Sequence, residues 1–557
     1  MGPSSILNAG TGALYNSGMK LFGRDAADGP LRFDDGRARV EARVAAIPGG
    51  GFRLSGTVRG RPGRIEVFRA SAPRRFLMNN WQSWGPIQAV TPEFRFPGLA
   101  ERMAQYSRYV FTPIPDIFAS GLVSDYVIAW EGMTAGFLSS RIAHPYFIVE
   151  GDDLAGYLEY FGTRLVEDVP LESFVVVPGP EMGEGLAEYA RLAASENGAS
   201  PPRRNPIGWS SWYQYFTNLT AADLQKNLRL AGNGFPFEVF QIDDGYERDI
   251  GDWLDVKDGF PALSDLASLI RGHGFTAGIW TAPFSAAPSS EVFRRHPGWF
   301  VAEDGRPRPC YRNWGKPIFA LDTTHPEAKQ WLFETFAALR RMGFAYFKID
   351  FLFAAAMEGA RHAPVSPIRA YRQGLDVIRK AVGVDFILGC GAPLLPSIGF
   401  VDGMRVGEDT APFWDPRMSG IQGPNAYTAL KNVILRSFLH RRWWLNDPDC
   451  LLLREKDIRL TFSEKQLYAR VCGVLDNMLI VSDDLELVDE RGRSLLREAI
   501  ALQGGRPRVA GLMEDDFYVL ESMGRSDRAE RLAANLSEAE RSVAGRAVPP
   551  RSAVFLE

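Results

Sequence analysis

The chain has 557 residues and carries 63 basic against 67 acidic side chains, a formal net charge of −4 at pH 7. Hydrophobic residues make up 46% and charged residues 23% of it, which excludes a wholly disordered or fibrous protein; the length predicts about two to four domains. The near balance of charge excludes a strong overall field that would attract nucleic acid or anionic lipid.

The sequence also bears on the cellular compartment. No apolar run is long enough to span a membrane, and the first 20 residues lack the apolar block of a signal peptide. The four scattered cysteines are too few for a disulfide framework and are typical of a reducing compartment. We therefore expect a cytoplasmic protein that does not enter the membrane.

Residues 30–180 alternate apolar and polar side chains in short runs between turn residues, which predicts strands with no convincing helix. Because one face of each strand needs cover, we expect an N-terminal β-sandwich over residues 1–180. A helix over 182–198 and the segment PPRRNP (201–206) indicate a linker helix and boundary over 181–204. The clearest predicted strands are 52–58, 64–70, 126–132, 146–153 and 173–179.

From residue 207 onward, apolar strands alternate with helical patterns. Eight such strands predict a central (β/α)8 TIM barrel over residues 205–485. A doubly wound open sheet is the alternative, but its nucleotide loop is missing, because Gly389-Cys390-Gly391 lacks the third glycine of that motif. The expected barrel strands are 207–212, 237–245, 275–284, 344–352, 385–393, 403–410, 442–449 and 477–484.

The pattern weakens after about residue 490. Residues 517–522 and 552–557 are typical of strands, whereas 527–541 favours a helix by propensity, with a strand as the alternative. We expect a small C-terminal β domain over 486–557, which completes a multidomain β and α/β protein.

Cofactor motifs are missing from the sequence. The six histidines do not occur at metal-ligand spacing, and the chain has no HExxH, CxxC, Walker-type loop or GxSxG sequence. We therefore expect neither a metal nor a cofactor.

In a parallel barrel the active site lies at the carboxyl ends of the strands. Each acidic residue found there is, on its own, typical of a helix cap or a turn. Together, however, they converge on one face with aromatic residues and two cations, which indicates a site. The residues at these ends are Trp212, Asp243, Asp244, Trp280, Lys348, Asp350, Cys390, Arg405, Asp409, Asn446, Asp447, Asp483 and Asp484.

Lys348 and Asp350 are two residues apart in an apolar strand, so both project from the same face. One interpretation is a buried ion pair that holds the barrel together. The functional interpretation is a carboxylate kept ionised by a nearby cation and ready to act as a nucleophile. A Schiff base at Lys348, as in an aldolase, is a further alternative.

Arg405 and Asp409 share parity in the strand predicted over 403–410, which favours Asp409 over Glu408 as the inward-facing carboxylate unless a bulge intervenes. Two carboxylates from different strands, flanked by aromatic residues, favour glycoside hydrolysis. A carbohydrate-binding protein without activity is the alternative, although binding alone does not require the pair. Asp243 and Asp244 suit sugar hydroxyls or, less well here, a divalent cation.

Seven segments of the chain form a set of motifs in a fixed order: NNWQSWG (79–85), GWSSWYQYF (208–216), FQIDDGYE (240–247), GIWTAPF (278–284), YFKIDFL (346–352), ILGCGAPLLPSIGFVDGMRVGEDTAPFW (387–414) and WWLNDPDCLL (443–452). Together they resemble the family 36 glycoside hydrolases, the melibiase-like α-galactosidases. The resemblance implies a β-sandwich, a (β/α)8 barrel and a C-terminal β domain, and it implies a strand in the C-terminal segment where propensity favours a helix.

The resemblance implies a retaining exo-α-galactosidase that acts on small α-1,6-linked oligosaccharides, with Asp350 as nucleophile and Asp409 as acid/base. An α-N-acetylgalactosaminidase or a galactosyl-transferring member of the family is the alternative, and the oligomeric state stays open. The implied substrate-binding residues are Asp243, Asp244, Lys348, Cys390, Arg405, Trp212, Tyr213, Trp280 and Trp81, with Trp84 as the alternative to Trp81.

The proposed roles set the charge states that we expect. Asp350 should stay ionised beside Lys348. Asp409 must hold a proton at working pH, so its pKa should be raised, by the charge of Asp350 and by burial.

Overall fold

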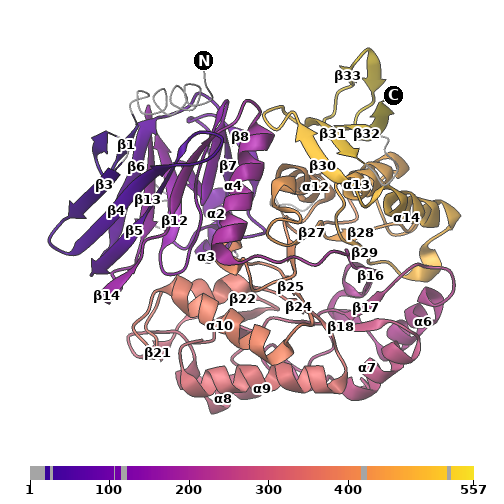
Figure 1. Cartoon of the computed structure of the whole chain (residues 1–557). Helices are drawn as coiled ribbons and strands as arrows, with labels where there is room; N and C mark the ends of the chain where they lie inside the picture. The colour runs from indigo at the N-terminus through magenta and orange to yellow at the C-terminus, as the bar shows by residue number, and fades with distance from the viewer. Residues whose placement is uncertain are drawn as a thin grey trace.

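The protein is described by a computed structural model, in which an N-terminal part of antiparallel strands adjoins a parallel sheet with helices and a small C-terminal antiparallel sheet (Figure 1). No helix within the described ranges is long and apolar enough to cross a lipid bilayer. The structure describes residues 19–25, 29–105, 107–114, 122–415, 423–523 and 529–556.

The N-terminal strands form two antiparallel sheets that pack face to face. Phe68 of one sheet lies 5.0 Å from Phe174 of the other, between ring centroids, and Phe147 lies 5.4 Å from Phe137. Interleaved aromatic side chains of this kind are the core expected of a sandwich. One sheet contains, in order, β2 (Arg24–Asp25), β1 (Lys20–Leu21), β6 (Arg64–Ser71), β13 (Asp153–Glu159), β12 (His144–Glu150) and β9 (Leu122–Asp125). The other contains β3 (Gly29–Asp34), β4 (Ala38–Ala46), β5 (Phe52–Gly60), β15 (Phe174–Pro178), β11 (Met133–Phe137), β10 (Val127–Trp130), β7 (Phe76–Asn79) and β8 (Ile87–Val90), with β14 (Leu165–Pro170) paired to β5.

Two short helices interrupt these strands, where the sequence predicted no helix: α2 (Leu99–Gln105) and α3 (Arg108–Phe111). Helices this short give no clear periodic signal. The hydroxyl of Ser107 caps α3 by accepting from the Tyr109 amide (3.1 Å) and donates to the carbonyl of Cys310 (2.8 Å). This bond attaches the helical segment to the barrel region.

The predicted linker helix is α4 (Met182–Asn197), which ends at Gly198 with φ 66°. Tyr189 packs against the second sheet at Gly136, where a Cβ atom would come within 2.4 Å of the tyrosine ring. On another part of the helix, the carbonyl of Ala190 accepts a 2.9 Å hydrogen bond from the Trp443 indole. The helix thus joins the sandwich to the barrel (Figure 1).

All eight strands predicted for the barrel occur, and they pair in parallel. The seventh is interrupted at Pro448 and Asp449; its first half pairs with the sixth strand and its second half with the eighth. The sheet therefore curls back on itself, consistent with a TIM barrel. In pairing order the strands are β16 (Ile207–Ser210), β17 (Val239–Ile242), β18 (Thr276–Thr281), β24 (Tyr346–Ile349), β25 (Phe386–Gly389), β26 (Gly403–Arg405), β27 (Leu445–Asp447) with β28 (Cys450–Leu451), and β29 (Leu479–Val481).

Helices follow most of these strands. The last of these helices, α14 (Glu490–Leu502), comes after β29 and packs against α13 (Phe462–Val474). We therefore propose that the barrel extends to Leu502, the end of α14, instead of residue 485. The other predicted boundaries stay predictions. The longer helices are α6 (Ala221–Ala231), α7 (Leu263–Gly272), α9 (Pro326–Met342), α10 (Pro367–Val382), α12 (Ala426–Leu435), α13 (Phe462–Val474) and α14 (Glu490–Leu502), and the short ones are α5 (Trp212–Tyr215), α8 (Glu291–Arg295) and α11 (Leu394–Ser397).

An insertion separates β18 from α9 and carries two small sheets. Its turn at Trp314 has φ 50° and follows β22. The strands are β19 (Ser285–Ala286), β22 (Pro309–Asn313) and β23 (Lys316–Ala320) in one sheet, and β20 (Ala302–Glu303) and β21 (Arg306–Pro307) in the other.

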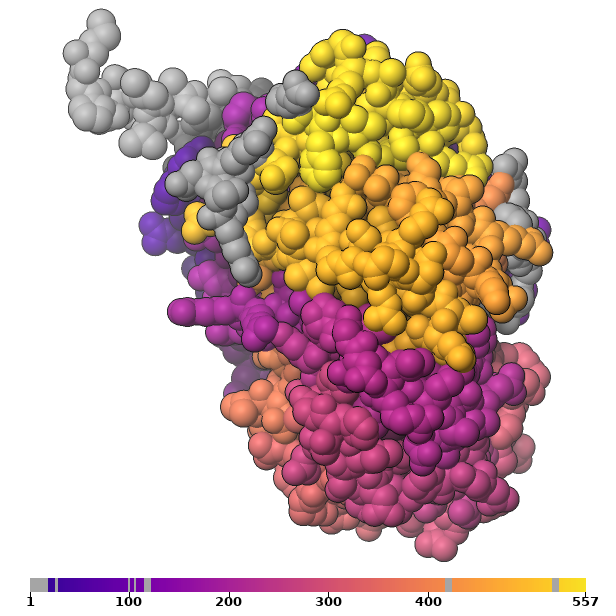
Figure 2. Space-filling view, turned by 90° about the vertical axis from the view of Figure 1, so that its right-hand side faces the viewer, coloured from indigo at the N-terminus to yellow at the C-terminus, as the bar shows by residue number. Residues whose placement is uncertain are grey.

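The C-terminal sheet corrects one prediction. Residues 529–535 form a strand that pairs on both sides, so the helix favoured by propensity over 527–541 is wrong; residues 527, 528 and 557 lie outside the described part. Cross-strand pairing and burial outweigh weak helix propensity here. The sheet packs against α13. In Figure 2 the yellow C-terminal residues lie directly on the orange part of the chain that precedes them. Its strands are β30 (Arg506–Ala510), β31 (Phe517–Met523), β32 (Ala529–Asn535) and β35 (Ser552–Leu556), beside a hairpin of β33 (Arg541–Val543) and β34 (Arg546–Val548).

Candidate active site

A cavity of about 450 Å³ lies at the carboxyl ends of the barrel strands. Seven of the predicted site residues line it: Trp212, Asp243, Asp244, Trp280, Lys348, Asp350 and Asp409. Eight others do not line it and are buried: Trp81, Tyr213, Cys390, Arg405, Asn446, Asp447, Asp483 and Asp484. Lining residues that the sequence reasoning did not select include Arg102, Phe111, Tyr311, Trp314, Phe351 and Phe353.

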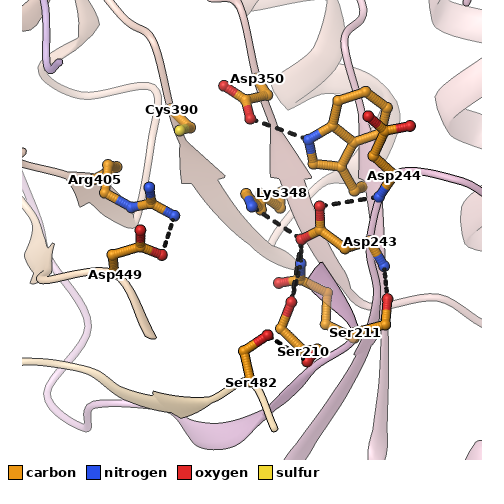
Figure 3. A network of polar contacts seen from close by, with 12 residues as sticks. Ser210, Ser211, Asp243, Asp244, Lys348, Asp350, Cys390, Arg405, Asp449 and Ser482 are labelled. Carbon is orange, nitrogen blue, oxygen red and sulfur yellow. Dashed lines mark hydrogen bonds and ion pairs between the residues drawn. The ribbon is translucent and has the colours of Figure 1, made fainter. Parts of the chain in front are cut away.

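Lys348 faces the barrel interior, because its neighbour Phe347 contacts Phe336 of α9 on the outside. Its ammonium group donates to Asp243 Oδ2 at 2.9 Å, and both side chains are buried (Figure 3). The ion pair therefore joins Lys348 to Asp243, whereas we expected Asp350 as its partner. Burial is the largest single influence and acts to lower the pKa of Lys348, but the nearby negative groups, Asp243 first and then Asp350, together outweigh it and raise that pKa well above its usual range. A protonated amine cannot attack a carbonyl group, so the Schiff-base alternative loses its support.

Asp350 follows β24 and is held by two hydrogen bonds. The Trp280 indole donates to Oδ2 at 3.1 Å, and the backbone amide of Phe351 donates to Oδ1 at 2.8 Å. Phe351 itself has φ 51°, a left-handed conformation that a bulky residue rarely adopts. The strained turn and the two donors fix one orientation of the Asp350 carboxylate at the cavity wall.

The adjacent aspartates differ in what they can still bind. Asp243 is fully engaged, since its carboxylate accepts from Lys348, Gln241, Ser210 Oγ and the Asp244 amide. Asp244 Oδ2 accepts from the indole of Trp314 at 2.8 Å. Its Oδ1 is buried and has no hydrogen-bond partner among the described residues. Asp244 is therefore the member of the pair with an acceptor left for a ligand.

The environment of Asp244 also changes its charge. Burial, together with the neighbouring carboxyl group of Glu247, raises the pKa of Asp244 to about 9. This shift favours the protonated form of the Asp244 carboxyl group, which can donate a hydrogen bond, as toward Glu247, as well as accept one. Among the residues that the structure describes, no three His, Cys, Asp or Glu side chains are placed to hold a metal ion.

Arg405 lies behind the cavity and binds three carboxylates. Its Nη1 lies 2.9 Å from Asp409 Oδ1, its Nε 3.2 Å from Asp447 Oδ2 and its Nη2 2.7 Å from Asp449 Oδ1. Strand β26 ends at Arg405, so the alternation of strand side chains does not reach Asp409 as we assumed. Glu408 also lines the cavity, where it pairs with Arg102 at 3.3 Å, instead of pointing elsewhere.

Asp409 has a raised pKa of about 7. Burial is the largest cause, the charges of Asp449 and Asp350 add to it, and Arg405 opposes it. The direction agrees with our expectation for an acid/base residue, although burial contributes more than the charge of Asp350. The Asp409 side chain is 35% exposed, so a ligand in the cavity can reach it.

Two of the predicted binding residues support others from behind. The hydroxyl of Tyr213 donates to Asp449, which in turn binds Arg405. The thiol of Cys390 accepts a hydrogen bond from the Trp84 indole at 3.3 Å, and burial keeps the pKa of this thiol well above its usual range. Cys390 thus holds the lining side chain of Trp84, whereas Tyr213 acts through Asp449 and Arg405 on Asp409.

The sandwich domain contributes Trp84, not Trp81, to the cavity. Trp81 is fully buried, meets the ring of His144 edge-on with centroids 6.0 Å apart, and directs its indole N–H toward the Val110 carbonyl. Within one tight loop, the first tryptophan therefore turns into the sandwich and the second turns toward the barrel. The sequence could not separate them, because both lie in the same motif.

The two tryptophans should respond differently to substitution. Trp84→Ala is expected to raise KM for an aryl α-galactoside by about three- to tenfold, because an aromatic contact with the ligand is lost. Trp81→Phe is expected to lower the thermal midpoint and leave KM within about twofold, because it affects only core packing. Steady-state kinetics and thermal unfolding of both variants test this. An increased KM in Trp81→Phe alone would contradict it.

Asp449 and Trp314 are contacts that the sequence reasoning missed. Asp449 stands at the end of a predicted strand, two residues after Asp447, so its shared parity with that residue was an available signal. Trp314 lies in the insertion, where no strand end marks it. Because Trp314 and Asp244 are 70 residues apart in the chain, no sequence pattern predicts their contact.

A curled parallel sheet that brings two carboxylates and several aromatic rings into one cavity at its carboxyl end defines a barrel of the glycoside hydrolase type. A family model described as "Alpha-galactosidase, N-terminal" matches residues 44–178, and one described as "Melibiase" matches residues 191–375. The chain is 31% identical to TtGalA, an α-galactosidase from Thermus thermophilus solved in complex with stachyose. That comparison has a TM-score of 0.70 and covers 86% of this chain and 100% of TtGalA. The chain belongs to the melibiase-like glycoside hydrolases of family 36.

Curated relatives match over shorter segments. The α-galactosidase AgaA from Geobacillus stearothermophilus is 28% identical over 146 residues, which cover 25% of this chain and 19% of that protein. A protein from Flavonifractor plautii named "A type blood alpha-D-galactosamine galactosaminidase" is 29% identical over 211 residues, 34% of this chain and 19% of that protein. The matched segments therefore span about a fifth of the length of each of these relatives.

Proposed function

We propose that the protein is a retaining exo-α-galactosidase that hydrolyses terminal α-linked galactose in small oligosaccharides such as those of the melibiose and raffinose type. The observation that carries the proposal is that Asp350 and Asp409, which follow different barrel strands, line one cavity beside Asp243 and Asp244. Membership of family 36 and the similarity to an α-galactosidase solved with stachyose support it. A cytoplasmic location stays a prediction.

In this proposal Asp350 is the nucleophile and Asp409 the acid/base residue. The carboxylate of Asp350 attacks the anomeric carbon while the bond to the leaving oxygen breaks, and Asp409 gives its proton to that oxygen. Asp409 then takes a proton from water, which attacks the anomeric carbon and releases Asp350. The two displacements restore the α configuration. The raised pKa of Asp409 supports its role as the acid.

Recognition of galactose would depend on Asp244 more than on Asp243. The buried Oδ1 of Asp244 has no partner in the described structure, so a sugar hydroxyl that reaches it satisfies a polar group that is otherwise unpaired. An epimer that leaves this group unpaired would bind much less well. The cavity extends to Lys348, which faces the barrel interior. A site of this shape accepts the end of a sugar chain, which supports exo action.

Substrate choice separates the proposal from the alternative in the same family. We expect kcat/KM for an aryl α-galactoside to exceed that for the matching α-N-acetylgalactosaminide by roughly 100-fold or more, because a pocket built around one sugar rejects an added group. The Flavonifractor relative is the reason to test the second substrate. The reverse preference would favour the galactosaminidase.

The stereochemical course provides the second test. Proton NMR of the first product should show α-galactose before mutarotation, as double displacement requires. Initial release of β-galactose would contradict the retaining mechanism. Galactosyl transfer to an added sugar, in place of hydrolysis, would favour the transferring alternative.

A further inference from the structure

Arg436 is a fully buried arginine that directly follows α12 and lies outside the cavity. Its Nη1 donates to the carbonyl oxygens of Ser83 and Val406, both at 2.9 Å. Its Nε and Nη2 donate to the side-chain oxygen of Asn79 at 3.1 and 3.0 Å. One guanidinium group therefore binds the sandwich domain and the barrel at the same time.

This cation is buried without a counter-charge. None of the ion pairs among the residues that the structure describes includes Arg436, and its guanidinium group donates to neutral oxygens, the side-chain amide of Asn79 and two backbone carbonyls. Burial lowers its pKa to about 9. A charged group in such a place is unfavourable for folding unless its hydrogen bonds compensate. The burial of Arg436 is best explained by the segments that it binds.

The segments that Arg436 binds lead directly to two walls of the cavity. Asn79 and Ser83 lie in the loop of residues 79–87, called the Trp84 loop here, whose residues Trp84, Gly85 and Pro86 line the cavity. Val406 follows β26 and precedes Asp409 by three residues. Arg436 is thus bonded to a backbone position just before each wall.

Other contacts fasten the Trp84 loop to the same side of the barrel. The amide of Ile87 donates to Asn432 of α12 at 3.0 Å, one helical turn before Arg436. The amide of Ser83 donates to the Ala392 carbonyl at 2.9 Å. These bonds join the loop to α12 and to the end of β25. The Arg436 bonds extend further, because they link this loop to Val406 in the segment that carries Asp409.

We propose that Arg436 is a positioning residue that fixes the Trp84 loop and the Asp409 segment relative to each other, so that the ligand meets both walls in the reactive geometry. The proposal rests on the proposed α-galactosidase activity. It predicts that loss of Arg436 affects turnover through Trp84 and Asp409, beyond any effect on folding.

The test is a double-substitution cycle of Arg436→Gln with Trp84→Ala. Arg436→Gln is expected to lower kcat/KM per folded protein roughly 10- to 100-fold, through kcat at the Asp409 wall and through KM at the Trp84 wall, since misplacing a catalytic wall has effects of this size. In the Trp84→Ala background the loss should be at least about threefold smaller, because one of the two walls is already missing. Losses that simply multiply would overturn the proposal.

Arg379→Gln is the matched control. Arg379 also donates to backbone carbonyls, those of Phe400 and Asp385, but at the opposite end of β25 and β26, and unlike Arg436 it pairs with a carboxylate, that of Asp402. It should lower the thermal midpoint and leave kcat/KM within about twofold. If Arg436→Gln behaves in the same way, Arg436 is structural only and the proposal fails.

Asn79→Ala removes the acceptor of two Arg436 hydrogen bonds and serves as a second variant if Arg436→Gln does not fold. It should reproduce a smaller loss of kcat/KM with the same dependence on Trp84. A kcat/KM equal to that of wild type would overturn the proposal. If wild type does not cleave the aryl α-galactoside at all, the proposed function is at fault, which keeps the two failures distinct.

Discussion

Replacement of Asp350 by alanine is expected to lower kcat for an aryl α-galactoside by about 10⁴-fold or more, the scale typical of losing a covalent nucleophile. Sodium azide should restore turnover, because the small anion can occupy the space of the missing carboxylate. Since azide would attack in a single displacement, the expected product is β-galactosyl azide, identified by NMR. The donors from Trp280 and Phe351 that orient the carboxylate stay in place in this variant.

Glu408→Gln is the control for this experiment, because Glu408 lines the same cavity but pairs with Arg102 at its edge. Its kcat should fall by less than about tenfold, and azide should not accelerate it. If Asp350→Ala keeps more than about a tenth of the wild-type kcat, Asp350 is not the nucleophile. Formation of α-galactosyl azide would likewise contradict its assignment.

The barrel strands could be predicted from sequence because their signal is local. Each is a short apolar run between helical patterns, and parallel strands bring their carboxyl ends to one edge whatever the loops do. This is why Asp243, Asp350 and Trp280, which are far apart in the chain, could be placed together. The two short helices near residue 105 were missed, and propensity alone favoured a helix where β32 lies, because tertiary contacts decide the conformation of these segments.

The polar partners within the site could be predicted less well. Parity placed Lys348 and Asp350 on one face but could not show that Lys348 pairs with Asp243 on the neighbouring side of the barrel. The parity argument for Asp409 assumed that the strand continues past Asp409. In the structure β26 ends four residues before it, at Arg405. Pairing across a barrel depends on side-chain geometry, and a sequence pattern with period two carries no information about it.

The alkaline limb of the kcat/KM profile is expected near pH 7 and should report Asp409. Asp409 acts as an acid only when protonated, so activity is full below its raised pKa of about 7 and falls as pH rises through that value. Asp409→Asn should abolish this limb and lower kcat/KM for melibiose by roughly 10²–10⁴-fold. The loss should be smaller for a dinitrophenyl galactoside, whose leaving group departs without a proton.

Two further variants decide whether the limb belongs to Asp409. Burial also raises the pKa of Glu408 to about 7, so Glu408→Gln must keep the limb if Asp409 is its source. Asp449→Asn should move the limb to lower pH, because the negative charge of Asp449 helps to raise the pKa of Asp409 and its loss frees Arg405 to oppose protonation. A limb that disappears in Glu408→Gln and persists in Asp409→Asn would assign the titration to Glu408 and leave Asp409 without the role of acid.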